Sequence, residues 1–174
     1  MAKIDINNND QLFKGLSMVN FIILDNNHLE LSGVKTLTSN LKSLYLVTSN
    51  NNHPAFQIQG RDNLKIIFYE NKVDFVDLFS KLKNDYNVDK LTIQSGGELN
   101  SIFLRSKLID KISIVVAPAL IGGRNTSTLI DGESLHTFED LKNIKALKLD
   151  KVDVLKNSYI HLKYDVINET EIKK

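Results

Sequence analysis

Residues 90–124 read KLTIQSGGELNSIFLRSKLIDKISIVVAPALIGGR, and this stretch decides the fold. Its apolar spacing predicts a buried strand, a glycine turn, a short amphipathic helix, a second buried strand and a second glycine turn. Strand, helix and strand in this order are typical of a βαβ unit. Each strand of the predicted unit is therefore followed by a glycine-rich loop.

The first glycine turn, Gly96-Gly97, follows the predicted strand at 90–94 and leads into a helix that begins with Glu98-Leu99. Glycine lacks a Cβ, so the backbone can approach a ligand closely and can adopt positive φ. The free N–H groups and the positive dipole end of a helix N-terminus favour a phosphate. The carboxylate of Glu98 opposes an anion in the same turn. Both a phosphate site and a purely structural turn remain open.

Composition places the chain among globular proteins and predicts one domain over residues 1–174. Hydrophobic residues make up 42% and charged residues 25% of the sequence. The net charge is +1, and the 22 basic and 21 acidic residues are spread along the chain, so we expect no nucleic-acid partner. There is no cysteine, which suits a reducing cytoplasm. No stretch approaches the roughly 20 apolar residues of a membrane span, and we expect a cytoplasmic protein without membrane contact.

The remaining sequence alternates strands with helices, which predicts an α/β fold. The apolar stripe of Phe75, Leu78, Phe79 and Leu82 predicts a helix that faces the core. We expect a mostly parallel central sheet with helices on both faces and a C-terminal antiparallel hairpin. The expected parallel strands begin at Val19, Ser43, Leu64, Leu91 and Ile112, and the hairpin spans 145–155 and 159–166.

Four short motifs occur in a fixed order: Gly96-Gly97, Leu99-Asn100, Leu108-Ile109-Asp110 and Pro118 to Gly123. In this order they resemble the reductase domain of riboflavin biosynthesis, a branch of the dihydrofolate-reductase-like superfamily. The resemblance extends, with decreasing clarity, over roughly residues 19–166.

The resemblance implies a dihydrofolate-reductase-like fold with NADPH as the hydride donor. It implies a pyrimidine bearing a ribosylamino phosphate as the substrate, as in the 5-amino-6-(5-phosphoribosylamino)uracil reductases. It also implies a homodimer with the strand at 112–117 or its neighbours near the contact. Whether NADH can replace NADPH stays open.

The resemblance also implies positions for the cofactor. The pyrophosphate is expected at the first glycine turn, flanked by the second, and the adenosine end just past the strand that ends at Asp25. The hydroxyls after the strand at 43–48 could reach a 2′-phosphate, or these polar residues could be ordinary turn formers. The candidate cofactor residues are Gly96, Gly97, Glu98, Leu99, Gly122, Gly123, Asn26, Thr48 and Ser49.

Two departures from the family pattern bear on activity. Many members carry Glu before the Gly-Gly turn, at the substrate's ribosyl portion, where this chain has Ser95. The family's opening strand and Ser-x-Asp-Gly loop are not found, which gives a second hypothesis of a non-catalytic nucleotide-binding or dimer-forming relative. We expect weak NADPH binding, slow or absent reduction, and loss of binding in Gly97→Val. The four histidines have no spacing typical of a zinc site.

Overall fold

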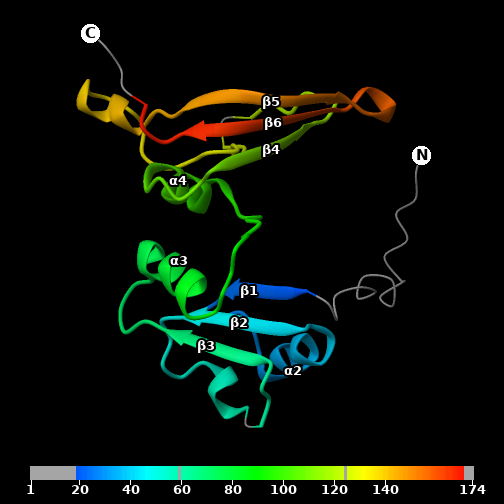
Figure 1. Cartoon of the computed structure of the whole chain (residues 1–174), viewed down its shortest axis with the longest axis vertical. Helices are drawn as coiled ribbons and strands as arrows, with labels where there is room; N and C mark the ends of the chain where they lie inside the picture. The colour runs from blue at the N-terminus through cyan, green and yellow to red at the C-terminus, as the bar shows by residue number, and fades with distance from the viewer. Residues whose placement is uncertain (1–18, 59, 124, 171–174) are drawn as a thin grey trace. The chain divides into compact units, whose positions relative to one another are not determined.

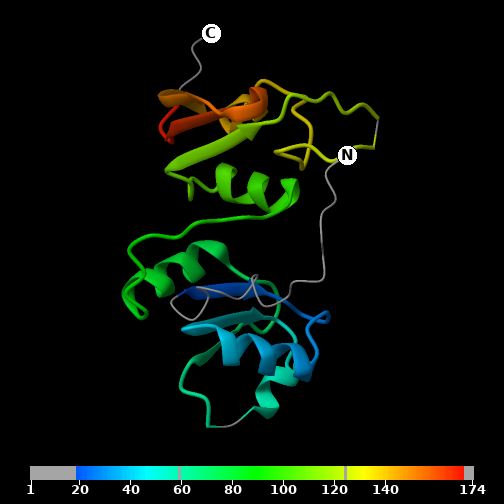
Figure 2. The ribbon, with the colours of Figure 1, turned by 90° about the vertical axis from the view of Figure 1, so that its right-hand side faces the viewer.

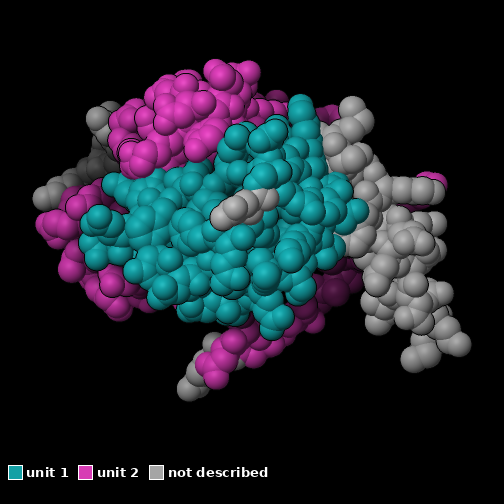
Figure 3. Space-filling view, turned by 90° about the horizontal axis from the view of Figure 1, so that it is seen from below, with its two compact units in different colours: residues 1–74 teal, residues 75–174 magenta. Residues whose placement is uncertain are grey.

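The structure is a computed structural model and describes residues 19–58, 60–123 and 125–170. The chain divides into two compact units, residues 1–74 and 75–174, which Figure 3 distinguishes by colour. Each unit contains one three-stranded sheet (Figure 1). The expected lack of the family's opening strand and Ser-x-Asp-Gly loop concerns residues before Val19, which lie outside the described residues.

The first unit is built on a parallel sheet in the order β1-β2-β3. Its strands are β1 (Asn20–Leu24), β2 (Ser43–Thr48) and β3 (Leu64–Phe68). The central strand β2 is buried along almost its whole length, as its continuous apolar run predicts. Parallel pairing brings the carboxyl ends of all three strands to one edge of the sheet.

A helix and a short 3₁₀ turn complete the first unit. Helix α2 (Leu31–Asn40) connects β1 to β2, and η2 (Pro54–Gln57) lies between β2 and β3. Val34 of α2 is fully buried and packs in one cluster with Leu44 and Leu46 of β2. Figures 1 and 2 both show α2 against the sheet. This core fixes β2, and the carboxyl end of β2 lies at that edge of the sheet.

The second unit is built on an antiparallel sheet in the order β4-β6-β5. Strands β5 and β6 form the predicted C-terminal hairpin. The elements are α3 (Phe75–Asn84), α4 (Gly97–Arg105), β4 (Lys111–Val116), η3 (Glu139–Asn143), β5 (Ala146–Val154), η4 (Lys156–Ser158) and β6 (Ile160–Ile167).

Helices α3 and α4 pack through aromatic rings. Phe103 is buried and meets Phe75 at a centroid distance of 4.9 Å and Phe79 at 5.5 Å. The predicted apolar stripe of α3 is therefore core. In both Figures 1 and 2, α4 lies beside the β4-β6-β5 sheet.

The α/β class and the C-terminal hairpin are confirmed, but two strand predictions were wrong in detail. Residues 90–94 form no strand, because no described segment pairs with them in a ladder, and Leu91 is 36% exposed. β4 pairs antiparallel with β6, so the parallel and antiparallel strands form two sheets. The apolar run of β4 predicted burial on both faces, whereas Val115 is 56% exposed.

Candidate functional site

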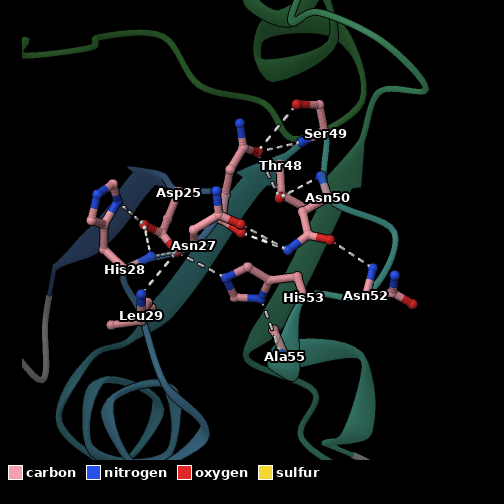
Figure 4. Close-up of polar contacts among 11 residues, drawn as sticks. Asp25, Asn27, His28, Leu29, Thr48, Ser49, Asn50, Asn52, His53 and Ala55 are labelled. Atoms are coloured by element: carbon pink, nitrogen blue, oxygen red, sulfur yellow. Dashed lines mark hydrogen bonds and ion pairs between the residues drawn. The ribbon is translucent and has the colours of Figure 1, made fainter.

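The carboxyl edge of the β1-β2-β3 sheet carries a cluster of polar side chains (Figure 4). Asp25 follows β1 directly, Thr48 ends β2, and Ser49 follows it. Ligands of parallel α/β sheets bind outside the carboxyl ends of the strands. This edge is therefore the first candidate region in the first unit.

Asn26 is the centre of the cluster. Its Oδ1 accepts hydrogen bonds from Thr48 Oγ1 at 3.0 Å, from the Ser49 N–H at 2.7 Å and from Ser49 Oγ at 3.2 Å. Its backbone carbonyl accepts from Asn50 Nδ2 at 2.7 Å. The structure thus brings together three predicted cofactor residues from two strand ends. Thr48 is fully buried, so its hydroxyl holds Asn26 instead of facing solvent.

Asp25 fixes the turn that precedes α2. Its carboxylate accepts from the N–H groups of His28 at 3.1 Å and Leu29 at 2.9 Å, and from His53 Nε2 at 3.0 Å. Burial alone would raise the pKa of Asp25, but the hydrogen bonds from Leu29, His53 and His28 outweigh it and lower this pKa. Asp25 is therefore held as a carboxylate at neutral pH.

Sequence reasoning missed the part that His53 takes in this cluster. His53 begins the 3₁₀ turn η2, and its side chain is buried against Asp25. The only local signal was a His-Pro pair in the loop after a buried strand, together with the polar turn after β1. The partners lie 28 residues apart, so no local pattern reveals the contact.

A cavity of about 210 Å³ opens at the same edge. Apolar side chains from β1, β2 and the segment after β3 form part of its wall, and the turn after β1 adds polar groups. The lining residues are Leu24, Asp25, Asn26, His28, Val47 and Val73. Apolar walls with a few placed polar groups are typical of small-ligand sites.

The second candidate region lies at the amino end of α4, in the second unit. Gly96 is the N-cap with φ −75° and ψ 168°, and neither glycine of the pair has positive φ. The turn therefore does not use the positive φ that glycine can adopt, because the chain enters α4 from ordinary extended backbone at Gly96. Among the described residues, the N–H groups of Gly97, Glu98 and Leu99 have no hydrogen-bond acceptor.

The two glycines of this turn have different surroundings. A Cβ at Gly96 would meet nothing within 4 Å, whereas one at Gly97 would collide with the Asp131 carboxylate and lie 2.7 Å from the Thr128 carbonyl oxygen. The Asp131 N–H also donates to the Gly97 carbonyl at 3.0 Å. Gly97 is thus required by packing, while Gly96 leaves open space at the helix terminus.

The loop at 128–131 is tied to this helix terminus by side chains. Asn100 Oδ1 accepts from Ser95 Oγ at 2.6 Å, and Asn100 Nδ2 donates to the Leu129 carbonyl at 3.0 Å. Hydrogen bonds from the Thr128 hydroxyl and N–H lower the pKa of Asp131. Ser95, the predicted substrate residue, therefore has its hydroxyl engaged with Asn100.

The second glycine loop forms a turn of its own. Gly123 has φ 123°, a conformation that side chains rarely adopt. Thr126 Oγ1 donates to the Gly122 carbonyl at 2.9 Å, and a Cβ at Gly122 would meet nothing within 4 Å. Gly123 is therefore required by backbone conformation, and Gly122 is not required by packing.

The described ranges contain no group of three His, Asp or Glu side chains able to hold a metal ion. None of the helices in these ranges has the length and apolar character needed to cross a membrane.

The chain is similar to reductases of one family. It is 32% identical over 102 residues to a 2,5-diamino-6-ribosylamino-4(3H)-pyrimidinone 5′-phosphate reductase of Methanothermobacter thermautotrophicus, covering 59% of this chain and 42% of that protein. A reductase of the same name from Aquifex aeolicus is 28% identical over 104 residues, covering 60% and 44%. The chain therefore spans less than half the length of these relatives.

Solved structures support the same fold. Acinetobacter baumannii RibD aligns with a TM-score of 0.63 at 20% identity, covering 83% of this chain and 36% of that one. A pyrimidine reductase-like protein of Corynebacterium diphtheriae aligns with a TM-score of 0.62 at 15% identity, covering 84% and 60%. The predicted dihydrofolate-reductase-like fold is confirmed. The family model described as the RibD C-terminal domain matches residues 18–160, and the chain belongs to this family.

Proposed function

We propose that this chain binds NADPH and belongs to a cytoplasmic reductase of a ribosylaminopyrimidine phosphate, the substrate class in the names of its relatives. In this proposal both compact units are parts of one reductase domain. The bound NADPH would supply the hydride, and the residues of the chain would bind and orient it. The absence of cysteine suits a reducing compartment.

The observation that carries the proposal is the preorganised cluster around Asn26. Its carboxamide oxygen is saturated by donors from Thr48 and Ser49, so its position is fixed before a ligand arrives. The neighbouring cavity of about 210 Å³ has room and apolar walls for a planar base. We assign the adenosine end of NADPH to this edge, with Ser49 and Asn26 near the ribose and its 2′-phosphate.

The amino end of α4 supports a role in binding the pyrophosphate. The N–H groups of Gly97, Glu98 and Leu99 are free of acceptors among the described residues, and Gly96 leaves open space beside them. A helix terminus of this kind favours an oxyanion. Gly122 and Gly123 are assigned to the flank of the cofactor, and Ser95 to the substrate through the hydroxyl that now contacts Asn100.

A second candidate function is a nucleotide-binding relative without catalysis. It is favoured by Ser95, whose hydroxyl is engaged by Asn100 at 2.6 Å and carries no charge. Two assays separate the candidates: fluorescence titration with NADPH, and NADPH consumption with 2,5-diamino-6-ribosylamino-4(3H)-pyrimidinone 5′-phosphate. Saturable binding with turnover supports the reductase, and binding without turnover supports the relative. Absence of saturable binding at millimolar NADPH contradicts both.

We expect binding to be weak. If the nicotinamide end of the cofactor is held poorly, the missing interactions cost a few kcal/mol, which is on the order of a hundredfold in dissociation constant. Repeating the titration with NADH tests the 2′-phosphate assignment. If Ser49 contacts that phosphate, Ser49→Ala should weaken NADPH binding more than NADH binding.

We also propose a homodimer that uses the β4-β6-β5 sheet. Apolar side chains of this sheet are exposed, including Val115 at 56%, Leu149 at 52% and Val154 at 81%. Exposed apolar surface of this kind is typical of interaction sites. Analytical ultracentrifugation tests the state, and a monomer at micromolar concentration would contradict it. Val115→Asp should shift a dimer toward monomer, and Val76→Asp is the matched control on exposed apolar surface of α3.

A further inference from the structure

His53 is buried, with 1% of its surface exposed, and both of its ring nitrogens are engaged (Figure 4). Nδ1 accepts from the Ala55 N–H at 3.1 Å, and Nε2 lies 3.0 Å from Asp25 Oδ2. A nitrogen that accepts an N–H carries no proton, so the imidazole is neutral and its proton is on Nε2. His53 therefore donates a charge-assisted hydrogen bond to the Asp25 carboxylate.

This bond differs in origin from the other bonds to Asp25. The other donors, His28 and Leu29, belong to the same short turn as the carboxylate. His53 reaches it from the connection between β2 and β3 and is thus, among the described residues, the long-range donor to the Asp25 carboxylate. The Asp25 side chain is 7% exposed, and a carboxylate with so little solvent contact needs such donors, because an unpaired buried charge is costly.

Asn26 follows Asp25 directly and is one of the residues that line the cavity. Holding the Asp25 carboxylate therefore also restricts the backbone position of Asn26. We infer that His53 is a positioning residue: through Asp25 it holds the turn that presents Asn26 at the cavity. His53 itself does not line the cavity. The inference rests on the proposed function only in naming NADPH as the ligand.

Two substitutions separate the two bonds of the imidazole. In His53→Gln the side-chain amide nitrogen can take the place of Nε2 and keep the donor to Asp25. In His53→Asn the amide oxygen can take the place of Nδ1 and keep the acceptor for Ala55, while the shorter side chain loses Asp25. Both variants remove the buried ring, and the Asn side chain is one methylene shorter than the Gln side chain.

The first measurement is hydrogen exchange of the Ser49 amide, which donates to Asn26 Oδ1 at 2.7 Å and needs no ligand. We expect faster Ser49 exchange in His53→Asn and near-parent exchange in His53→Gln. The second is NADPH titration of the same variants. We expect about tenfold weaker binding for His53→Asn, which corresponds to 1.4 kcal/mol, and a change of less than about threefold for His53→Gln.

Asn63→Ala is the matched control. Asn63 Nδ2 donates to the carbonyls of Thr38 at 2.7 Å and Leu41 at 3.2 Å, before the start of β2. Loss of the Asn63 side chain should destabilise the first unit. Once this change in global stability is allowed for, the Ser49 amide should exchange as in the parent. Equal Ser49 exchange in the Gln and Asn variants would overturn the positioning role. Failure of the parent to bind NADPH would overturn the proposed function and leave the exchange result to decide this inference.

Discussion

The carboxyl edge of the β1-β2-β3 sheet and the amino end of α4 are both candidate nucleotide regions, but they are built differently. At the sheet edge, side chains from separate segments bind one another, as Asn26 does with Thr48 and Ser49. At the helix terminus, backbone N–H groups that have no acceptor in the described part of the chain lie beside the open position of Gly96. The first region should be sensitive to lost hydrogen bonds and the second to added bulk or charge.

The largest effect is expected from added bulk at the packed glycine. In Gly97→Val the new side chain would collide with Asp131 and the Thr128 carbonyl, so the 128–131 loop must move. Overpacking of this kind costs about 2–3 kcal/mol in free energy of unfolding. Urea denaturation followed by circular dichroism measures it, with Gly122→Val as the control in open space. Equal losses in the two variants would remove the distinction between the glycines.

The same collision makes Gly97→Val a poor test of binding. Any loss of NADPH binding in that variant follows from the clash with Asp131, whether or not a phosphate binds. Substitutions at Gly96 are the sharper test of the helix terminus.

A smaller effect is expected from removing a charge at the sheet edge. Asp25→Asn keeps the size of the side chain but weakens the bonds from Leu29, His28 and His53. Hydrogen bonds to a charged group are worth more than neutral ones, and we expect a loss of about 2 kcal/mol in the free energy of unfolding. Thermal or urea denaturation measures this, with the exposed Asp62→Asn as control. A loss no larger than in the control would show that Asp25 does not anchor the turn.

The stabilisation by Asp25 should depend on pH. Its folded pKa lies below the ordinary value of 3.8, so the unfolded chain takes up the proton first as the pH falls. The contribution is therefore complete well above pH 3.8 and is lost as the pH drops through the folded pKa. We expect the difference in unfolding free energy between parent and Asp25→Asn to be large near neutral pH and to shrink in strong acid. A difference that stays constant would contradict the lowered pKa.

The smallest effect on stability is expected at Gly96, and with the opposite sign. Aspartate is a favoured N-cap, and its charge suits the helix dipole, so Gly96→Asp should stabilise the fold by about 0.5 kcal/mol. Its carboxylate would occupy the same N–H groups that a phosphate needs. The same urea experiment tests this, and clear destabilisation would show that the space beside Gly96 is not open.

Much of the parallel sheet could be predicted, because its information is local. The sequence alone indicates β1, β2 and β3 by their apolar runs, and it indicates the turn at Asn26 by its polar residues. Asn26, Thr48 and Ser49 could be placed together because parallel strands end at one edge. The ring of His53 could not be placed there from the sequence, because its partner Asp25 is 28 residues away.

In the second unit, local sequence patterns were not enough to predict the structure. Residues 90–94 alternate like a strand, yet a strand also needs a pairing partner, and none of the described segments provides one. Gly97 could be recognised as part of a turn, but the reason for it is Asp131, a residue from another loop. Pairing and packing partners decide such positions, and the sequence pattern does not name them.

The central claim, that this chain binds NADPH, is tested most directly by fluorescence titration of the parent and Gly96→Asp side by side. We predict saturable binding by the parent and at least about tenfold weaker binding by Gly96→Asp, although that variant is equally or more stable. Gly96→Ala, which adds a Cβ into open space without charge, should bind nearly as well as the parent. Absence of saturable binding to the parent, or equal affinity in Gly96→Asp, would contradict the account.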